Sequence, residues 1–318
     1  MTVTGVLAGN DGRKMSKSYG NYPDPRDSLE NYGGDAIRMF LLSSPLFAGG
    51  DPSVSEENFG EAMRAYILPL RNSFSFFVSY ANIDKWDKRD EAYDISTKTH
   101  PLDRFLYAKV QELISTVDQS MQAYDLMRSS RALGSFLDDL TNWYIRRSRR
   151  RFRKEEEDVD KDDAYATLYY ALVNFCQVSA PFMPFIAEYI YQQLTGKESV
   201  HLTDWPIADV EHSDQELLAQ TKQAQKVISI VLAARSRKNI RVRQPLQSIT
   251  IGVEVAEYFR EIIADECNVK EVQIDTSINS LVTKICKPDG KYVGETFGGK
   301  TKEIFAAAKS GEFTENTD

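Results

Sequence analysis

Hydrophobic residues recur every three or four positions through the middle of the chain, which is the period of amphipathic α-helices. Four such stretches follow one another with short connections, at residues 102–124, 126–154, 164–178 and 184–194. Two prolines before the fourth stretch, and Gly196 after it, mark its boundaries. Consecutive amphipathic helices with short links predict an antiparallel helical bundle, so the expected fold class is mainly α.

Shorter helical patterns precede the bundle. Residues 36–42 predict a short helix that ends near Pro45, with Asp35 as its N-cap. Residues 56–80 predict a longer helix with one apolar stripe, which Pro69 should kink. The polar segment at residues 84–99 predicts a connector into the bundle.

The pattern changes after residue 205. One more amphipathic helix at 215–238 precedes short β-like runs at 248–253, 269–274 and 281–286, with helices at 256–266 and 300–309. This alternation indicates a small C-terminal α+β module. We therefore expect three parts: residues 1–50 with a surface loop, residues 51–205 with the helical bundle, and residues 206–318 with a long helix and the α+β module.

Composition is ordinary for a soluble protein, with 318 residues of which 42% are hydrophobic and 27% charged. The net charge is −8, yet the positive charge is concentrated in two places. One is the run from Arg146 to Lys154. The other is residues 217–253, which contain seven Lys and Arg residues and no Asp or Glu. Segregated cations in an acidic protein indicate a surface that faces a polyanion.

Several kinds of site find no support in the sequence. The three cysteines form no C-x-x-C pair and the three histidines are scattered, so we expect no metal site and no Ser/His/Asp or Cys/His catalytic arrangement. No window is apolar enough to predict a spanning helix, and the first residues lack the features of a secretory signal. A cytoplasmic location is the expectation.

The most informative motif lies near the N-terminus, where Lys14-Met15-Ser16-Lys17-Ser18 has neither helical nor strand periodicity. This predicts a surface loop. Two lysine ammonium groups on such a loop can close over a polyphosphate and neutralise the charge that grows on a leaving pyrophosphate. The alternative is a solvated Lys/Ser loop without such a role.

This pentapeptide resembles the KMSKS signature of class I aminoacyl-tRNA synthetases at every position. Its extension to Pro25 and the segments at 32–45, 142–152, 180–191 and 241–246 are similar to isoleucyl-tRNA synthetase. The likeness covers nearly the whole chain. The chain resembles the C-terminal portion of the proteins of that family, which contains the KMSKS loop and the anticodon-binding domain. It implies a ligase that activates isoleucine with ATP and Mg²⁺ and then charges its tRNA.

The resemblance also implies roles for residues. Lys14 and Lys17 would be catalytic, with Lys17 the more directly engaged, and Met15, Ser16 and Ser18 would join them in binding ATP. The family often has an aromatic residue where Arg153 stands. The HIGH motif and the editing domain that the resemblance implies are absent from this sequence, which suggests a fragment or a broken reading frame. We expect this portion alone to be inactive, with no ATP or Mg²⁺ bound.

The cationic segments are the candidate tRNA contacts. In the bundle the candidates are Trp143, Arg146, Arg147, Arg150 and Arg151; the alternatives are a solvated helix end paired with residues 155–163, and a Trp143 in the core. After the long helix, Arg241 and Arg243 could clamp phosphate and Gln244 could read a base edge, or all three could be ordinary solvated turn residues.

The leading hypothesis is thus the tRNA-binding part of an isoleucine–tRNA ligase, a monomer with isoleucine-accepting tRNA as its partner and no membrane partner. One alternative is a valine or leucine ligase, since those relatives share the bundle. Another is a non-catalytic RNA-binding module, against which the intact lysine motif argues.

Overall fold

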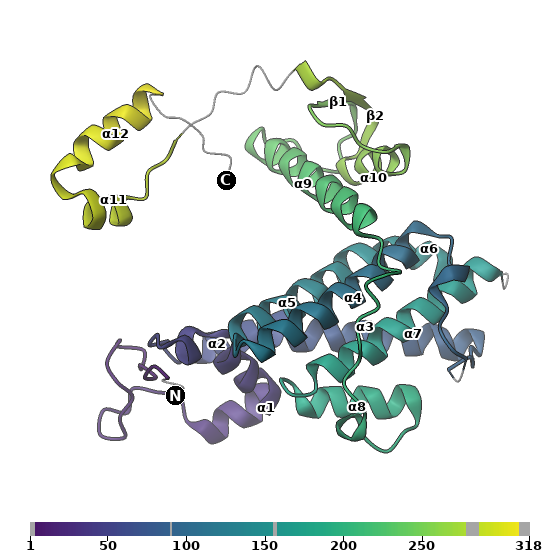
Figure 1. Cartoon of the computed structure of the whole chain (residues 1–318), viewed down its shortest axis with the longest axis horizontal. Helices are drawn as coiled ribbons and strands as arrows, with labels where there is room; N and C mark the ends of the chain where they lie inside the picture. Colours follow the sequence, from purple (N-terminus) through teal and green to yellow (C-terminus); the bar gives the residue numbers. More distant parts are fainter. Residues whose placement is uncertain (1–3, 90, 155–157, 278–285, 312–318) are drawn as a thin grey trace. The chain divides into compact units, whose positions relative to one another are not determined.

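The computed structural model describes residues 4–89, 91–154, 158–277 and 286–311 and forms two compact units, Met1–Leu218 and Ala219–Asp318. Both units are mainly helical, as the sequence predicts (Figure 1). The three-part division at residues 50 and 205 stays a prediction. No helix among the described residues is both long and apolar enough to cross a bilayer.

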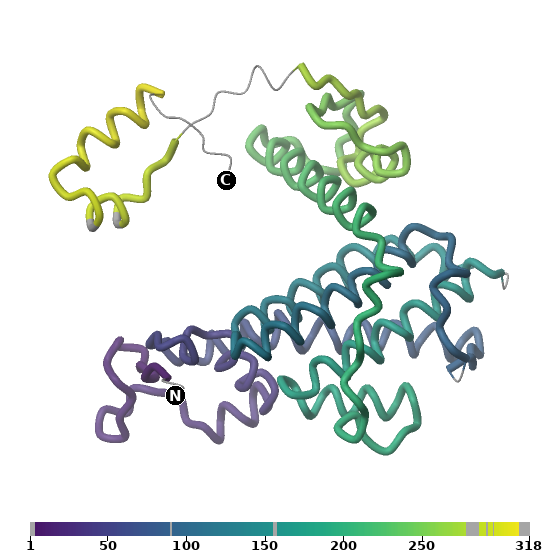
Figure 2. The backbone as a smooth tube through the Cα atoms, in the orientation of Figure 1, coloured from purple at the N-terminus to yellow at the C-terminus, as the bar shows by residue number. Residues whose placement is uncertain are grey.

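The first unit is built from eight α-helices in its described part, which the tube in Figure 2 follows from purple to green. They are α1 (Pro25–Ser43), α2 (Glu56–Ala62), α3 (Leu68–Asp84), α4 (Pro101–Gln122), α5 (Leu126–Asp138), α6 (Arg146–Phe152), α7 (Val159–Ser179) and α8 (Pro184–Thr195). Helix α4 packs against α5 and α7, and α7 packs in turn against α3 and α8. This confirms the predicted helical bundle.

The core of the bundle follows the predicted apolar stripes. All five inward positions predicted for the second stretch are buried: Leu133, Phe136, Leu137, Leu140 and Tyr144. The Phe136 ring stacks on Phe175 of α7 with 5.4 Å between ring centroids. Burying such rings supplies most of the hydrophobic stabilisation of a core of this kind.

Two π-helical turns interrupt helices that the sequence predicts as continuous. One, at Asp139–Ile145, separates α5 from α6, and the other, at Met63–Ile67, separates α2 from α3 just before Pro69. A π-turn takes more residues than an α-turn, so it shifts the face that later side chains occupy. Trp143, Tyr144 and Ile145 are consequently all buried, which an amphipathic stripe with 3.6 residues per turn does not predict.

The prediction for Asp35 is wrong. Helix α1 begins at Pro25, where Asp24 accepts from the Arg26 and Asp27 amides, and it bends at Gly33 with φ 78° and ψ 159°. Asp35 lies inside α1, and its carboxylate accepts from the backbone amides of Phe185 (3.3 Å) and Ile186 (2.7 Å) at the start of α8. The missing N-cap of one helix is thus supplied by a residue about 150 positions away.

Arg38 joins the same junction from the next turn of α1. Its Nη2 donates to the Pro181 carbonyl at 2.9 Å and its Nε to the Phe182 carbonyl at 3.3 Å. Burial raises the pKa of Asp35, and the hydrogen bonds from Ile186 and Phe185 partly offset this. The segment that follows the lysine loop is therefore fixed to the bundle by hydrogen bonds at two side chains.

The second unit holds most of α9 (Gln215–Arg237), then β1 (Leu246–Ile251), α10 (Glu257–Cys267), β2 (Val269–Ile274), α11 (Gly290–Phe297) and α12 (Thr301–Ser310). Strands β1 and β2 pair in parallel, with Leu246 opposite Val269 and Ile251 opposite Ile274, and α10 connects them. The α+β character is as predicted. Helix α11 is not predicted, and most of the strand predicted at 281–286 lies outside the described residues.

Candidate functional site

The lysine loop is organised by one side chain, that of Asn21. Its Oδ1 accepts from the Ser16 amide at 3.0 Å, and its Nδ2 donates to Asp11 Oδ1 at 2.9 Å and to the Lys14 carbonyl at 3.3 Å. A tight turn at Gly12 precedes the motif, with φ 74°. The backbone on either side of the motif is thereby held together, while the lysine side chains take no part in the holding.

The motif is partly exposed, since Met15 and Ser16 are half-buried. Lys14, Lys17 and Ser18 are exposed. The hydroxyls of Ser16 and Ser18 share a hydrogen bond of 2.8 Å. Neither lysine has an ion-pair partner among the described residues, so both ammonium groups are available to an external anion. This fits the chemistry of polyphosphate binding.

Neighbouring charges in the loop are already paired with one another. Asp11 accepts from Asn21 and from Arg13, and these hydrogen bonds lower the pKa of Asp11 to about 2. The Arg13 guanidinium also lies over the Tyr19 ring, 4.7 Å from its centroid. The loop therefore keeps its carboxylate ionised and occupied, and leaves the two lysines as its uncommitted charges.

In the bundle, the structure places Arg151 inside the protein. The residue is 5% exposed, and its guanidinium makes a bidentate pair with the fully buried Asp103, at 2.8 and 2.6 Å. Its Nε also lies 2.8 Å from Asp160 Oδ1. Burial disfavours the charged form, but the Asp103 hydrogen bonds and the attraction of the negative charges of Asp103 and Asp160 together outweigh it, so the pKa of Arg151 is raised. Arg151 is committed to α4 and α7, and we remove it from the candidate tRNA contacts.

Trp143 is also buried, with 6% of its surface exposed. The Arg147 guanidinium lies over its ring, 4.2 Å from the centroid, in a cation–π contact. The ring is covered and has no free face for a nucleotide base. The structure thus favours the core alternative for Trp143 and makes Arg147 a partly buried residue at the edge of the surface.

The remaining cations of α6 lie on the surface. Arg146, Arg149 and Arg150 are exposed, and Arg146 Nε donates to the Asn142 carbonyl at 3.1 Å. The acidic stretch neutralises part of the cation run, as the alternative interpretation expects: Asp158 and Asp160 pair with Lys154, and Asp160 also pairs with Arg151. Asp163 pairs instead with Lys98, outside the run. Residues 155–157 of the stretch lie outside the described residues.

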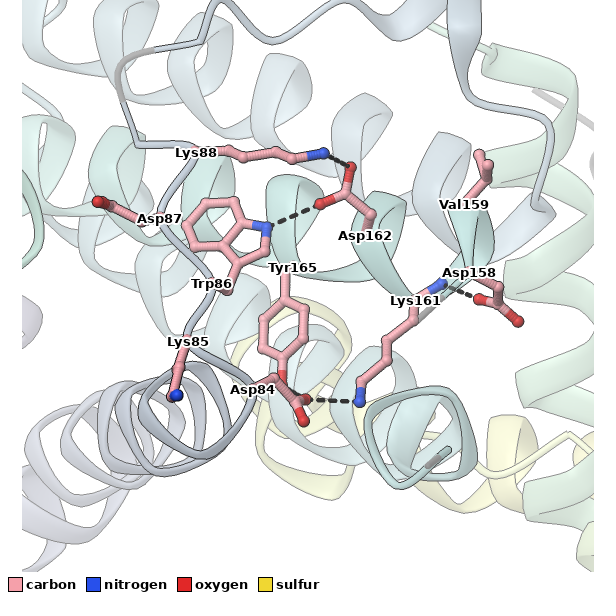
Figure 3. Close-up of a pocket in the computed structure, with 10 residues that line it drawn as sticks. All are labelled: Asp84, Lys85, Trp86, Asp87, Lys88, Asp158, Val159, Lys161, Asp162 and Tyr165. Carbon is pink, nitrogen blue, oxygen red and sulfur yellow. Dashed lines mark hydrogen bonds and ion pairs between the residues drawn. The ribbon is translucent and has the colours of Figure 1, made fainter. Parts of the chain in front are cut away.

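A pocket of about 390 Å³ lies where α3 ends and α7 begins (Figure 3). Its charges satisfy each other: Lys88 pairs with Asp162 at 2.7 Å and Lys161 with Asp84 at 2.7 Å. Trp86 Nε1 donates to Asp162 as well. These charged groups are therefore committed to one another, and they carry no argument for a ligand. The described residues contain no group of His, Cys, Asp and Glu that could hold a metal ion.

The third candidate set lies in the second unit, on the turn between α9 and β1. Arg241, Arg243 and Gln244 are all exposed there. The turn is closed by a hydrogen bond from the Gln244 amide to the Arg241 carbonyl at 3.0 Å. All three residues lie on one turn, as expected for residues within four positions of one another.

Sequence reasoning missed two residues that organise these sites, Asn21 and Arg235. Asn21 stands next to Gly20, and an Asn beside a Gly is a turn signal that could have identified it. Arg235 was counted only as one cation among several. It is 3% exposed, and no local pattern distinguishes it from the exposed Arg237.

Comparison with known proteins agrees with these features. Residues 1–51 match the family described as "tRNA synthetases class I (I, L, M and V)", and residues 103–250 match the "Anticodon-binding domain of tRNA ligase". A solved ternary complex of Agrobacterium radiobacter K84 agnB2 LeuRS with tRNA and LeuAMS shares the fold, with a TM-score of 0.50 and 20% identity. That similarity covers 66% of this chain and 24% of that one. The chain belongs to the class I tRNA synthetases.

Within that class, the chain is similar to several isoleucine–tRNA ligases. The chain is 39% identical to the enzyme of Leifsonia xyli subsp. xyli and 38% identical to that of Thermus thermophilus, over 98% and 94% of its length. Identity to the Treponema denticola enzyme is 36% over 96% of the chain. The chain spans less than a third of the length of these relatives, at 28%, 30% and 29% respectively.

Proposed function

We propose that this chain is the tRNA-binding part of an isoleucine–tRNA ligase, together with the lysine loop of its catalytic site. The observation that carries the proposal is the exposure of arginines within a matched anticodon-binding domain, in a protein whose net charge is negative. Exposed guanidinium groups bind phosphate through paired N–H donors. The relatives named above, all isoleucine ligases, favour isoleucine over the valine alternative.

The proposed tRNA contacts are Arg146, Arg147 and Arg150 in the bundle, and Arg241, Arg243 and Gln244 on the turn. Trp143 and Arg151 are left out because both are buried. We also propose that the protein is monomeric and cytoplasmic. It would bind the anticodon arm of the tRNA through the charged phosphate backbone and the unpaired bases.

The test is the salt dependence of binding between the purified chain and isoleucine tRNA. Replacing Arg146, Arg147 and Arg150 together with Gln should reduce the slope of log affinity against log salt by about 0.7–0.9 for each lost phosphate contact. The control is the pair Arg71→Gln and Lys197→Gln, which removes exposed charges elsewhere and should leave the slope unchanged. An equal slope for wild type and the triple variant would remove α6 from the tRNA face. Equal affinity for isoleucine, valine and leucine tRNAs would favour a general RNA-binding module.

For the lysine loop, we propose that Lys14 and Lys17 bind ATP phosphates, with Met15, Ser16 and Ser18 shaping the loop. ATP, and Mg²⁺ with it, would supply the phosphoryl chemistry of amino-acid activation. The lysines would hold the phosphate oxygens and neutralise charge as pyrophosphate leaves. The exposed, unpaired ammonium groups of the two lysines support this role.

This second part is testable in a chimera. The Thermus thermophilus ligase with its matching segment replaced by this chain should carry out isoleucine-dependent ATP–pyrophosphate exchange, and Lys17→Ala should slow it by about 100-fold or more. Arg26→Ala, an exposed cation outside the motif, is the matched control. A Lys17→Ala chimera with the exchange rate of its parent would contradict the catalytic role.

A further inference from the structure

Arg235 is a buried arginine whose contacts are backbone carbonyls. It is 3% exposed, near the C-terminal end of α9. Its Nη2 donates to the carbonyl of Arg241 at 2.8 Å, to that of Val242 at 3.2 Å, and to that of Gln244. Its Nε and Nη1 have no hydrogen-bond partner among the described residues. The polar contacts of this guanidinium therefore all go to one short turn.

The helix end fixes the position of Arg235 itself. The Ile240 amide donates to the Arg235 carbonyl at 2.9 Å, and the Asn239 amide donates to the Ser236 carbonyl at 3.0 Å. Asn239 has φ 55°. This pair of bonds around a left-handed residue is a Schellman motif, which ends the helix at a defined angle. The backbone of Arg235 and the start of the turn are thus locked together before its side chain contributes.

A second polar side chain, that of Asn268, donates to the same turn. Asn268, which ends α10 with φ 49°, donates through Nδ2 to the Val242 carbonyl at 2.9 Å. Its own carbonyl accepts from the Leu246 amide at 3.1 Å, where β1 begins. The carbonyls of residues 241, 242 and 244 therefore point toward Arg235 and Asn268, while the side chains of residues 241–244 are exposed.

We propose that Arg235, supported by Asn268, is a positioning residue that holds the 241–244 turn with its carbonyls inward and presents Arg241, Arg243 and Gln244 to tRNA. This inference rests on the proposed function. An arginine suits the task because the two N–H groups of Nη2 lie in the fixed plane of the guanidinium, where the three carbonyls share them. A carbonyl has lone pairs for more than one donor, so Val242 can accept from both Arg235 and Asn268. A turn ordered in advance loses less conformational freedom when it binds a phosphate backbone.

Two measurements test the proposal in the full chain. The first is hydrogen exchange at the amides of Ile240, Gln244 and Leu246, which report the order of the turn. Arg235→Met should speed exchange at these amides, while Arg237→Met, an exposed cation on the same helix, should leave it unchanged. If these amides exchange in Arg235→Met at the wild-type rate, Arg235 does not hold the turn, regardless of the result for tRNA binding.

The second measurement is tRNA affinity in a double-mutant cycle. Arg235→Met should weaken binding of isoleucine tRNA about ten-fold, as expected when a few loop residues must be ordered on binding. In a background with Arg241→Gln and Arg243→Gln, the same change should have almost no effect, because the residue acts through the turn. A full ten-fold loss in that background would overturn the positioning role.

Further variants keep the test decisive if Arg235→Met does not fold. Arg235→Lys retains a charged donor and should recover affinity to within about three-fold of wild type. Asn268→Gly retains the left-handed conformation, removes the amide donor, and should speed exchange at Gln244. If the wild-type chain does not bind tRNA, the proposed function is wrong, and the role of the turn in tRNA binding is wrong with it. The hydrogen-exchange data test separately whether Arg235 holds the turn.

Discussion

Two buried arginines, Arg151 in the bundle and Arg235 at the end of α9, solve the same problem in different ways. Arg151 meets the carboxylates of Asp103 and Asp160, and so forms a buried ion-pair network between helices. Arg235 meets carbonyls of a single turn beside it. A guanidinium paired with carboxylates fastens distant elements to each other, while one paired with carbonyls shapes a local segment.

The difference also separates the two cationic surfaces. Around Arg151, neighbouring positions divide between core and solvent: Trp143 and Arg151 are inside, Arg147 is half-covered, and Arg146 and Arg150 are outside. On the turn that Arg235 holds, Arg241, Arg243 and Gln244 are all outside. In the bundle, packing of the core therefore decides which cationic side chains reach the surface. On the turn, the side chains of Arg241, Arg243 and Gln244 are all exposed to a binding partner.

The largest expected effect comes from breaking the ion pair of Arg151. Asp103→Ala leaves a buried guanidinium without its main partner and should lower the free energy of unfolding by about 3–5 kcal/mol. Urea denaturation measures this. The double variant Asp103→Leu/Arg151→Met removes both charges and should recover most of the loss. A loss below about 1 kcal/mol for Asp103→Ala would show that Arg151 is not committed to the core.

A smaller effect is expected from Trp143→Phe, which tests where the bundle surface begins. The change removes part of a buried ring and weakens the cation–π contact with Arg147, and should cost about 1–2 kcal/mol. The tRNA affinity of the folded variant should stay within two-fold of wild type. Unchanged stability with ten-fold weaker binding would instead assign Trp143 to base stacking.

The smallest expected effect is on the pH dependence of stability and comes from His100, which lies in the electrostatic field of Arg151. Burial, and then the Arg151 charge, lower the pKa of His100 from 6.5. Its Nδ1 accepts from the Leu102 amide at 3.1 Å as the N-cap of α4. Because the unfolded chain binds a proton more readily than the folded one, stability is full above about pH 6.5 and is lost as pH falls toward the lowered pKa.

Unfolding measured at pH 7 and pH 5 checks this sign. His100→Asn keeps a capping side chain that does not titrate, and should reduce the loss between these pH values by up to about 1 kcal/mol. His212 acts in the opposite direction, since its hydrogen bond to Asp209 raises its pKa and its contribution is lost as pH rises. His212→Asn should therefore steepen the loss at low pH. A His100→Asn slope equal to that of wild type would contradict the lowered pKa of His100.

Local patterns were sufficient for much of the fold. The predicted strand at 269–274 coincides with β2, and the helices predicted at 102–124 and 215–238 match α4 and α9 to within two residues at each end. Local sequence patterns failed to predict features that depend on contacts between residues far apart in the chain. The caps of α8 come from Asp35, and the turns at 63–67 and 139–145 widen to π geometry.

For the candidate sites, the sequence by itself determined where the lysine motif lies, which segments are rich in cations, and that the body of the chain is helical. These follow from residue type and from periodicity over a few turns. Only the tertiary structure decided which arginines face solvent. Asp103 and Arg151 are 48 positions apart, and a buried charge depends on such a distant partner to offset the loss of water, so no short stretch of sequence records its burial.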